Sequence, residues 1–176
     1  DVEKIVVASA GCGSAMKEYG HLLEGDPLYS EKAMRFSALT VDITEFLADL
    51  PVDPPKVFLD TKVTFQDPCH LAHAQGITQA PRTLLRSVPG LKLVELANSD
   101  RCCGAAGIYA MLQKAMSGRI LDRKMKDVLD TGVSTIVTAN PGCVMQLEAG
   151  LRQVGKSGYV CHVVDILDQA YQLEDG

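Results

Sequence analysis

The sequence predicts an α/β fold with a mainly parallel sheet and helices on both of its faces. Short apolar runs rich in Ile, Val and Leu alternate along the chain with longer segments whose apolar residues recur at helical spacing. Regular alternation of this kind is typical of parallel sheets, because each pair of parallel strands needs a crossover connection. Open parallel sheets carry their functional loops at the carboxyl ends of the strands.

Strands are expected at five apolar runs bounded by polar or turn residues, namely 4–9, 62–66, 92–96, 134–139 and 159–164. Helices are expected in the segments between and after them, namely 13–24, 29–38, 42–49, 68–75, 80–87, 105–116, 118–131, 143–154 and 165–172. One basic cluster is expected to form a solvated helix face, with a docking surface as the alternative: Arg119, Arg123, Lys124 and Lys126.

Composition is that of a globular protein without an export signal. Of the 176 residues, 47% are hydrophobic and 22% are charged, which is enough apolar material for an ordinary core. No apolar run approaches the ~20 residues that span a bilayer, and the first residues lack the basic and apolar segments of a signal peptide. The net charge of −5, with Lys and Arg scattered along the chain, excludes nucleic acid as an expected partner.

Two stretches of the chain repeat one strand–turn–helix pattern. Residues 4–12 align without gaps on residues 135–143, with five of nine positions identical and a shared closing Gly-Cys. Val41-Asp42-Ile43 likewise matches Val164-Asp165-Ile166, each before an apolar helical pattern. The alternative is chance similarity between two such units.

This repeat predicts the domain organisation. Residues 1–50 are expected to be the tail of a first, truncated copy, 51–56 a proline-rich linker, and 57–176 a complete second copy.

Four cysteines lie in the second copy where strands give way to helices or glycine-rich turns. Asp67-Pro68-Cys69 and Asn140-Pro141-Gly142-Cys143 share a capping residue, a proline at the first helical position and a cysteine in the first turn. Cys102 and Cys103 follow the third expected strand and precede Gly104. Free N–H groups and the helix dipole favour thiolates at such junctions. The sequence therefore predicts that Cys69, Cys102, Cys103 and Cys143 converge as metal ligands, and the alternative is four unrelated buried thiols.

The neighbouring residues receive other roles. Cys12 repeats the same junction and is expected to be a ligand of the truncated first copy, hence a spare thiol in this chain. Cys161, inside an apolar strand, is expected to be a core residue. His70 and His73 are expected to bond sulfurs or helix-cap groups, with ligation by His73 as the alternative.

Three kinds of site remain open from the residues alone. The first is an iron–sulfur centre, because adjacent cysteines suit separate metal atoms of a cluster better than one small ion. The second is a structural zinc site with four thiolate ligands. The third is a metal-free thiol oxidoreductase that uses Cys102 and Cys103 as a vicinal dithiol. No catalytic acid, base or nucleotide-binding motif is found.

The motifs at 67–73 (DPCHLAH), 102–104 (CCG) and 140–143 (NPGC) resemble the cysteine-rich CCG domain family of iron–sulfur oxidoreductases. Within it, the chain is most similar to the C-terminal part of glycolate oxidase iron–sulfur subunits, with Ser9–Gly13 and Glu18–Gly20 adding to the likeness. The resemblance covers nearly the whole chain, and tandem CCG copies in the family match the repeat described above.

The resemblance implies a 4Fe–4S cluster, which an isolated chain can lack, bound by the four cysteines of the second copy. It implies an electron-transfer module, not itself catalytic, that passes electrons from a flavin-containing dehydrogenase subunit to a membrane acceptor. A ferredoxin-like segment of the same full-length protein is a further expected partner. A cytoplasmic location follows, with peripheral attachment to the inner face of the membrane as a variant.

One departure from the family limits what carries over. In the heterodisulfide reductase branch the last motif is Cys-x-x-Cys, whereas this chain has Asn140 at the first of those positions and Ser9 in the earlier copy. Four thiolates remain, the number that a cubane cluster needs. Heterodisulfide chemistry is therefore not expected here.

Overall fold

The chain folds around a four-stranded parallel sheet, which confirms the predicted α/β class. A computed structural model describes residues 2–51 and 53–173. Parts of the expected copies and linker, at positions 1, 52 and 174–176, lie outside the described residues. The strands, in the spatial order β4-β3-β5-β6, are β4 (Lys92–Glu95), β3 (Lys62–Phe65), β5 (Thr135–Thr138) and β6 (Tyr159–His162).

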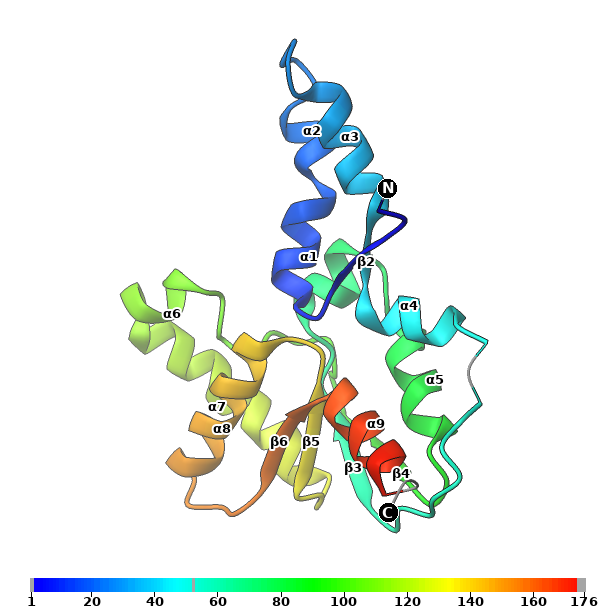
Figure 1. The fold of residues 1–176 in the computed structure, drawn as a ribbon. Helices are drawn as coiled ribbons and strands as arrows, with labels where there is room; N and C mark the ends of the chain where they lie inside the picture. The colour runs from blue at the N-terminus through cyan, green and yellow to red at the C-terminus, as the bar shows by residue number, and fades with distance from the viewer. Residues whose placement is uncertain (1, 52, 174–176) are drawn as a thin grey trace.

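Helices cover both faces of this sheet (Figure 1). On one face, Val63 and Phe65 of β3 and Val137 of β5 pack with α5 (Gln79–Ser87) and α9 (Val163–Gln172). On the other, Ile136 of β5 and Val160 of β6 pack with α7 (Lys114–Asp130) and α8 (Pro141–Gln153). Successive residues of a strand point to opposite faces, so neighbours such as Ile136 and Val137 belong to different cores.

The first part of the chain forms a separate two-stranded parallel sheet. Three of its helices rise as an arm above the body, and the fourth packs against α5 (Figure 1). Its elements are β1 (Ile5–Val7), α1 (Ala10–Lys17), α2 (Tyr19–Leu22), α3 (Ser30–Leu39), β2 (Thr40–Asp42) and α4 (Ile43–Asp49).

The helix expected over 13–24 is interrupted between α1 and α2. The hydroxyl of Ser37, on α3, donates to the carbonyl of Met16 at 3.0 Å and accepts from the N–H of Gly20 at 2.9 Å. It therefore takes the place of the helical bond from Gly20 to Met16, and an inserted side chain of this kind breaks a helix. The helix expected over 105–116 is also divided, into α6 (Ile108–Leu112) and the start of α7.

Strand pairing relates the two similar strand–turn–helix stretches in a register that differs in part from their match in sequence. Val7 pairs with Asp42 in the first sheet as Thr138 pairs with His162 in the second. Asp42 then caps α4 by accepting from the N–H two residues on, and His162 caps α9 in the same way. The equivalent of Asp42 is therefore His162, and the sequence match of Asp42 to Asp165 is three residues out of register.

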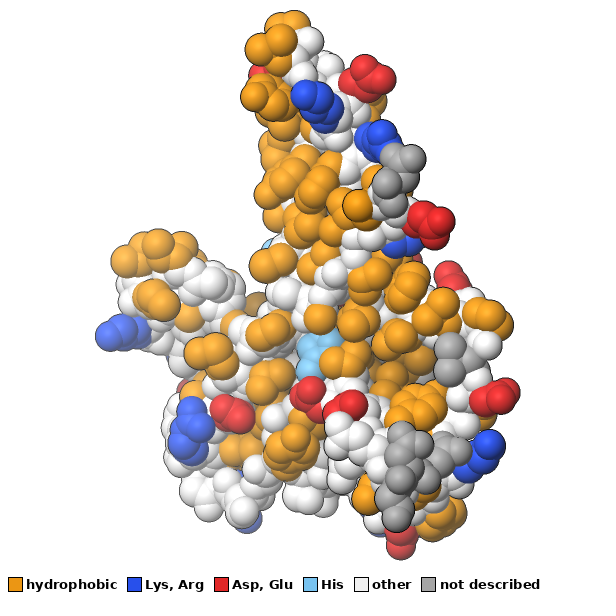
Figure 2. Space-filling view, viewed as in Figure 1, with side chains coloured by type: hydrophobic (Ala, Val, Ile, Leu, Met, Phe, Trp, Pro, Cys, Tyr) orange, Lys and Arg blue, Asp and Glu red, His pale blue; other side chains and the backbone are white. Residues whose placement is uncertain are grey.

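Exposed hydrophobic side chains gather on two projections, the arm and the outer end of α6 (Figure 2). On the arm they include Leu22, Leu28 and Met34, and on α6 they include Met111 and Leu112. Contiguous apolar surface of this kind is typical of contact sites. Among the described helices, none combines the length and the apolar character that crossing a membrane requires.

Candidate functional site

Three loops at the carboxyl edge of the sheet bring four cysteines together. β3, β4 and β5 are adjacent and parallel, so the segments that follow them emerge at one edge. Cys69 follows β3 and precedes a short π-helical turn, η1 (His70–Ala74); Cys102 and Cys103 follow β4; and Cys143 lies in the first turn of α8. Cys69 and Cys102 are partly exposed, whereas Cys103 and Cys143 are buried.

The four free thiols form a row of neighbours, in which Cys69 is hydrogen-bonded to Cys102, Cys102 to Cys103, and Cys103 to Cys143. Cys143 also interacts electrostatically with Cys69 and Cys102, so all four thiols belong to one cluster. Hydrogen bonds from the two neighbouring thiols, first Cys103 and then Cys69, lower the pKa of Cys102. A hydrogen bond from Cys103 likewise lowers the pKa of Cys143. The donors, Cys69 and Cys103, have raised pKa values for the same reason, aided by burial. Cys102 and Cys143 therefore favour the thiolate form, and Cys69 and Cys103 favour the protonated thiol.

Polar groups of the loops add donors to these sulfurs. The N–H of Gly104 donates to Cys102 Sγ at 3.3 Å, and the side-chain amide of Asn140 donates to Cys143 Sγ at 3.5 Å. Gly104 has φ +90°, and a Cβ there would lie 2.6 Å from the carbonyl oxygen of Ser117. Only glycine fits this turn without strain, so the residue after the cysteine pair is fixed by the backbone.

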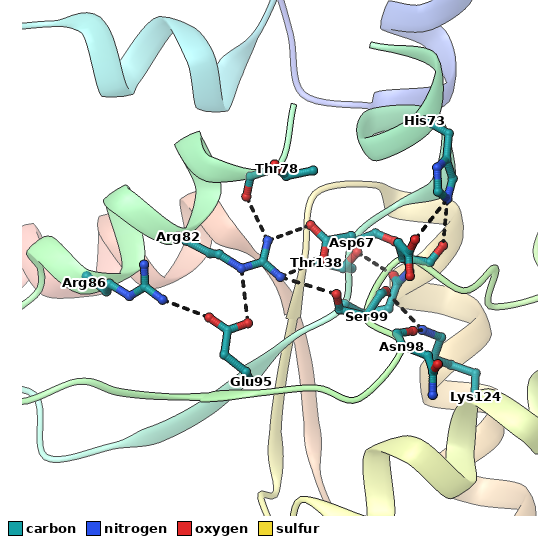
Figure 3. A network of polar contacts seen from close by, with 12 residues as sticks. Asp67, His73, Thr78, Arg82, Arg86, Glu95, Asn98, Ser99, Lys124 and Thr138 are labelled. Atoms are coloured by element: carbon teal, nitrogen blue, oxygen red, sulfur yellow. Dashed lines mark hydrogen bonds and ion pairs between the residues drawn. The ribbon is translucent and has the colours of Figure 1, made fainter. Parts of the chain in front are cut away.

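Asp67, expected to cap the helix after β3, instead forms a buried ion pair. Its two carboxylate oxygens accept from the two terminal nitrogens of Arg82, each at 2.8 Å. Arg82 also contacts Thr78, Glu95 and Ser99 (Figure 3). The N–H of Asp67 donates to the carbonyl of Ser99 at 3.1 Å. The network thus ties the segment before Cys69 to the loop that leads to Cys102.

Lys124 is not part of a solvated face, contrary to the sequence prediction. Its side chain is fully buried, and its Nζ donates to the carbonyls of Asn98 at 2.8 Å and Ser99 at 3.0 Å. Arg119, Arg123 and Lys126 of the same helix are exposed, as predicted. The burial of Lys124 could have been predicted from its spacing in the sequence, because it falls in one helical stripe with the buried residues Leu121 and Val128.

His70 contacts a sulfur as expected, whereas His73 contacts Asp100 instead of a sulfur or a helix cap. His70 Nδ1 lies 3.7 Å from Cys69 Sγ. His73 Nε2 lies 3.3 Å from the carbonyl oxygen of Asp100 and 3.6 Å from its carboxylate, so its ring is directed to the loop before the cysteine pair. Figure 3 shows this contact beside the Asp67 network.

Asn140 joins the two repeated units and makes no side-chain cap, contrary to expectation. Its side-chain oxygen accepts from the Ser9 hydroxyl and from the N–H of Gly11, each at 3.2 Å, while its amide nitrogen faces Cys143. Cys12, one residue beyond Gly11, is exposed and takes no part in the row of thiols. Cys161 is buried in the core of the opposite face, and burial raises its pKa to about 12.

The donor set fits an iron–sulfur cluster in its chemistry. Four thiols with amide donors around them are the usual ligands and outer partners of such clusters. Within residues 2–51 and 53–173, no three His, Cys, Asp or Glu side chains lie close enough together to hold a single metal ion. The sulfurs form a row of neighbours, an arrangement that several metal atoms can share.

Comparison with known proteins identifies the family. A family model of the cysteine-rich domain called CCG matches residues 63–148, which hold the four cysteines. The chain is also 33% identical over 165 residues to lactate utilization protein A of Lysinibacillus sphaericus, covering 93% of this chain and 72% of that protein. The chain belongs to the CCG cysteine-rich domain family.

Two longer relatives of this CCG protein carry a more specific name. The chain is 40% identical over 174 residues to a probable glycolate oxidase iron–sulfur subunit of Bacillus subtilis. It is 36% identical over 173 residues to the glycolate oxidase iron–sulfur subunit of Escherichia coli. These matches cover 97% and 98% of the chain. The chain spans 39% and 41% of the two relatives, so it corresponds to less than half of each.

Proposed function

We propose that this CCG protein is an electron-transfer module in which Cys69, Cys102, Cys103 and Cys143 bind one 4Fe–4S cluster. The observation that carries the proposal is the row of four interacting thiols at one edge of the sheet, with amide donors directed at the sulfurs. When bound, such a cluster supplies reversible one-electron transfer.

The residues of the chain prepare the site for negative charge. Gly104 and Asn140 donate to the sulfurs of Cys102 and Cys143, and the Asp67–Arg82 pair holds the segment before Cys69. Donors to thiolate sulfur stabilise the electron-rich state of a metal centre and tune its potential. The two buried cysteines exclude water from one side of the site, while the two partly exposed ones leave the other side accessible to an electron donor or acceptor.

A cluster suits the adjacent pair Cys102–Cys103 better than zinc does. Two neighbouring residues that bind one ion close a strained ring through the backbone, whereas they reach two metal atoms without that strain. Zinc prefers a closed tetrahedron of four ligands around a single point. The row of sulfurs is the specific observation that favours the cluster.

The names of the relatives support a place in 2-hydroxy-acid oxidation. We propose that a flavin-containing partner subunit oxidises a 2-hydroxy acid such as glycolate to the 2-oxo acid, which releases two electrons and two protons. This module, together with a ferredoxin-like segment of the full-length protein, passes the electrons singly to a membrane acceptor of the quinone class, which takes up both electrons and two protons. The proposal places the module in the cytoplasm, at the inner face of the membrane that holds this acceptor.

The proposal includes the tandem organisation. Residues 1–50 are the tail of a first CCG copy, 51–56 a linker, and 57–176 the second copy. The equivalent pairing of β1 with β2 and of β5 with β6 supports it. Cys12 is then a ligand of the first copy, completed by residues outside this chain. The apolar surface of the arm is the face that the remainder of that copy covers.

Metal analysis of the chain, purified and reconstituted without oxygen, tests the function. We expect iron and acid-labile sulfide in equal amounts and a brown colour that Cys102→Ser removes. The matched control, Cys161→Ser, changes a cysteine of the opposite core and keeps the colour. Zinc without sulfide would overturn the proposal in favour of a structural site, and a metal-free Cys102–Cys103 disulfide would favour a thiol oxidoreductase.

A second test addresses electron conduction in the complete complex. Replacing Cys102 and Cys103 by serine should stop reduction of the physiological acceptor, while the flavin subunit still reduces an artificial dye. Normal transfer to the physiological acceptor in this double variant would show that the module does not conduct.

A further inference from the structure

Lys124 is a buried cation whose ammonium group is hydrogen-bonded to backbone carbonyls. Its Nζ, on α7, is satisfied by two backbone carbonyls, those of Asn98 and Ser99, on the loop that leads to Cys102 (Figure 3). Among the described residues, no carboxylate lies within ion-pair distance of Nζ. Asp127, one turn further along α7, pairs instead with Arg101 at 2.7 Å.

Burial of such a charge is costly. An ammonium group transferred from water into a protein core loses several kcal/mol of solvation unless other charges compensate it. Two carbonyl dipoles satisfy its hydrogen bonds but leave its net charge in place. A methionine would fill the same space in the stripe of Leu121, Met125 and Val128 without that penalty. Negative charges beyond ion-pair distance therefore help the lysine to keep its charge, and the carboxylates of Asp127 and Asp100 are two of them.

The cysteine row supplies a further negative charge close to Lys124. Leu121, Met125 and Val128, which flank Lys124 on α7, pack in one hydrophobic cluster with Cys103 and Cys143. Alongside the stronger hydrogen bonds from neighbouring thiols, the charge of Lys124 favours the thiolate forms of Cys102 and Cys143. Burial lowers the pKa of Lys124 itself and the charge of Arg101 adds to that shift, while the charges of Asp127, Cys103 and Asp100 oppose it.

We infer that Lys124 is the fixed counter-charge of the four-cysteine site and that it raises the reduction potential of the bound cluster. This inference rests on the proposed function. Reduction adds one electron and makes the site one unit more negative, so a positive charge held in a medium of low polarity stabilises the reduced state more than the oxidised state. Lys124 is thus a positioning and tuning residue that acts through the sulfurs.

The test is the midpoint potential of the chain loaded with iron and sulfide, titrated without oxygen and followed by electron paramagnetic resonance. Lys124→Met should lower the equilibrium constant for one-electron reduction of the cluster about tenfold, which corresponds to a midpoint potential about 59 mV more negative. Lys124→Arg, which keeps the charge, should restore most of the difference. The matched control Lys126→Met, an exposed lysine two residues along α7, should leave the potential unchanged.

A purely structural role predicts a different pattern, in which Lys124→Met lowers the thermal stability but leaves the potential at the wild-type value. That result would overturn the inference. If the methionine variant fails to fold or to load, Lys124→Gln takes its place, because its side-chain amide still donates to a loop carbonyl. An unchanged potential in the glutamine variant would overturn the inference equally.

A second measurement needs no cluster. In the metal-free chain, the pH at which iodoacetamide alkylates Cys102 at half its maximal rate should lie about one unit higher in Lys124→Gln than in the wild type, which corresponds to a tenfold weaker ionisation of the thiol. Peptide mass spectrometry identifies the modified cysteine, and the same half-maximal pH in both proteins would contradict the counter-charge. If wild-type protein binds no iron and sulfide, the proposed function fails, while the alkylation result still decides the role of Lys124.

Discussion

Replacing Arg82 by methionine tests how the segment before Cys69 is held. The side chains of Arg82 and Asp67 are 10% and 3% exposed, and two hydrogen bonds of 2.8 Å join them. Removing one partner of a buried pair costs about 3–5 kcal/mol, because the remaining charge is left without compensation. The Glu95 contact adds little, since that side chain is 50% exposed and such pairs contribute about 0–1 kcal/mol. We therefore expect Arg82→Met to lower the free energy of unfolding by about 3–5 kcal/mol.

Urea unfolding of the full chain under reducing conditions, followed by circular dichroism, measures this loss. Arg86→Met is the matched control, because Arg86 is exposed and forms an ion pair with the half-exposed Glu95, so its loss should cost about 0–1 kcal/mol. The double variant Asp67→Asn/Arg82→Met should regain part of the lost stability, since it removes both charges of the buried pair. If Arg82→Met and Arg86→Met unfold at the same urea concentration, the buried pair does not stabilise this segment as argued.

Gly104→Ala should lower the free energy of unfolding by about 1–3 kcal/mol, because the residue has φ +90° and its new Cβ would meet a carbonyl of α7; an unchanged melting temperature by calorimetry would contradict this. Alkylation of the native chain should label exposed Cys12 quickly and Cys161, which is 2% exposed, only when the chain opens, whereas equal rates would refute the burial of Cys161. Burial lowers the pKa of His162 below 6.5, so the unfolded state binds this proton first and stability falls as the pH drops below 6.5. His162→Gln should flatten that decline in urea titrations at several pH values, while the exposed control His21→Gln should not; an equal slope in the two variants would show that His162 is not its source.

Much of the fold could be predicted because apolar periodicity is a local property. The strands and helices of the second sheet follow from it, as does the carboxyl edge where the cysteines lie. β2 was missed because three residues, Thr40–Asp42, are too few to display an alternating pattern. The interruption between α1 and α2 depends on Ser37, a contact from another helix that local sequence does not reveal.

The partners of the site were harder to predict than its cysteines. Asp67 and Asn140 both occupy positions typical of helix caps, and the local pattern favours that role. In the structure both side chains bond to groups distant in sequence: the Asp67 carboxylate accepts from Arg82, and the Asn140 side-chain oxygen accepts from Ser9. Such choices depend on tertiary packing. Of these three residues, only Lys124 had a surrounding that local sequence could predict, because its charge falls at a buried position of a helical stripe.

Asn140 makes the sulfur of Cys143 sensitive to the first unit of the repeat. A single planar amide has its oxygen fixed by Ser9 and Gly11 and its nitrogen directed at Cys143, so the first unit determines which way the donor faces. If the Ser9 loop shifts or is cut away, the amide is free to rotate, and the sulfur exchanges an oriented donor for water. A second unit expressed by itself would therefore hold all four cysteines yet differ electronically from the same unit in the intact chain. Under the proposed tandem organisation, communication between the two copies would pass through the rotation of one side chain.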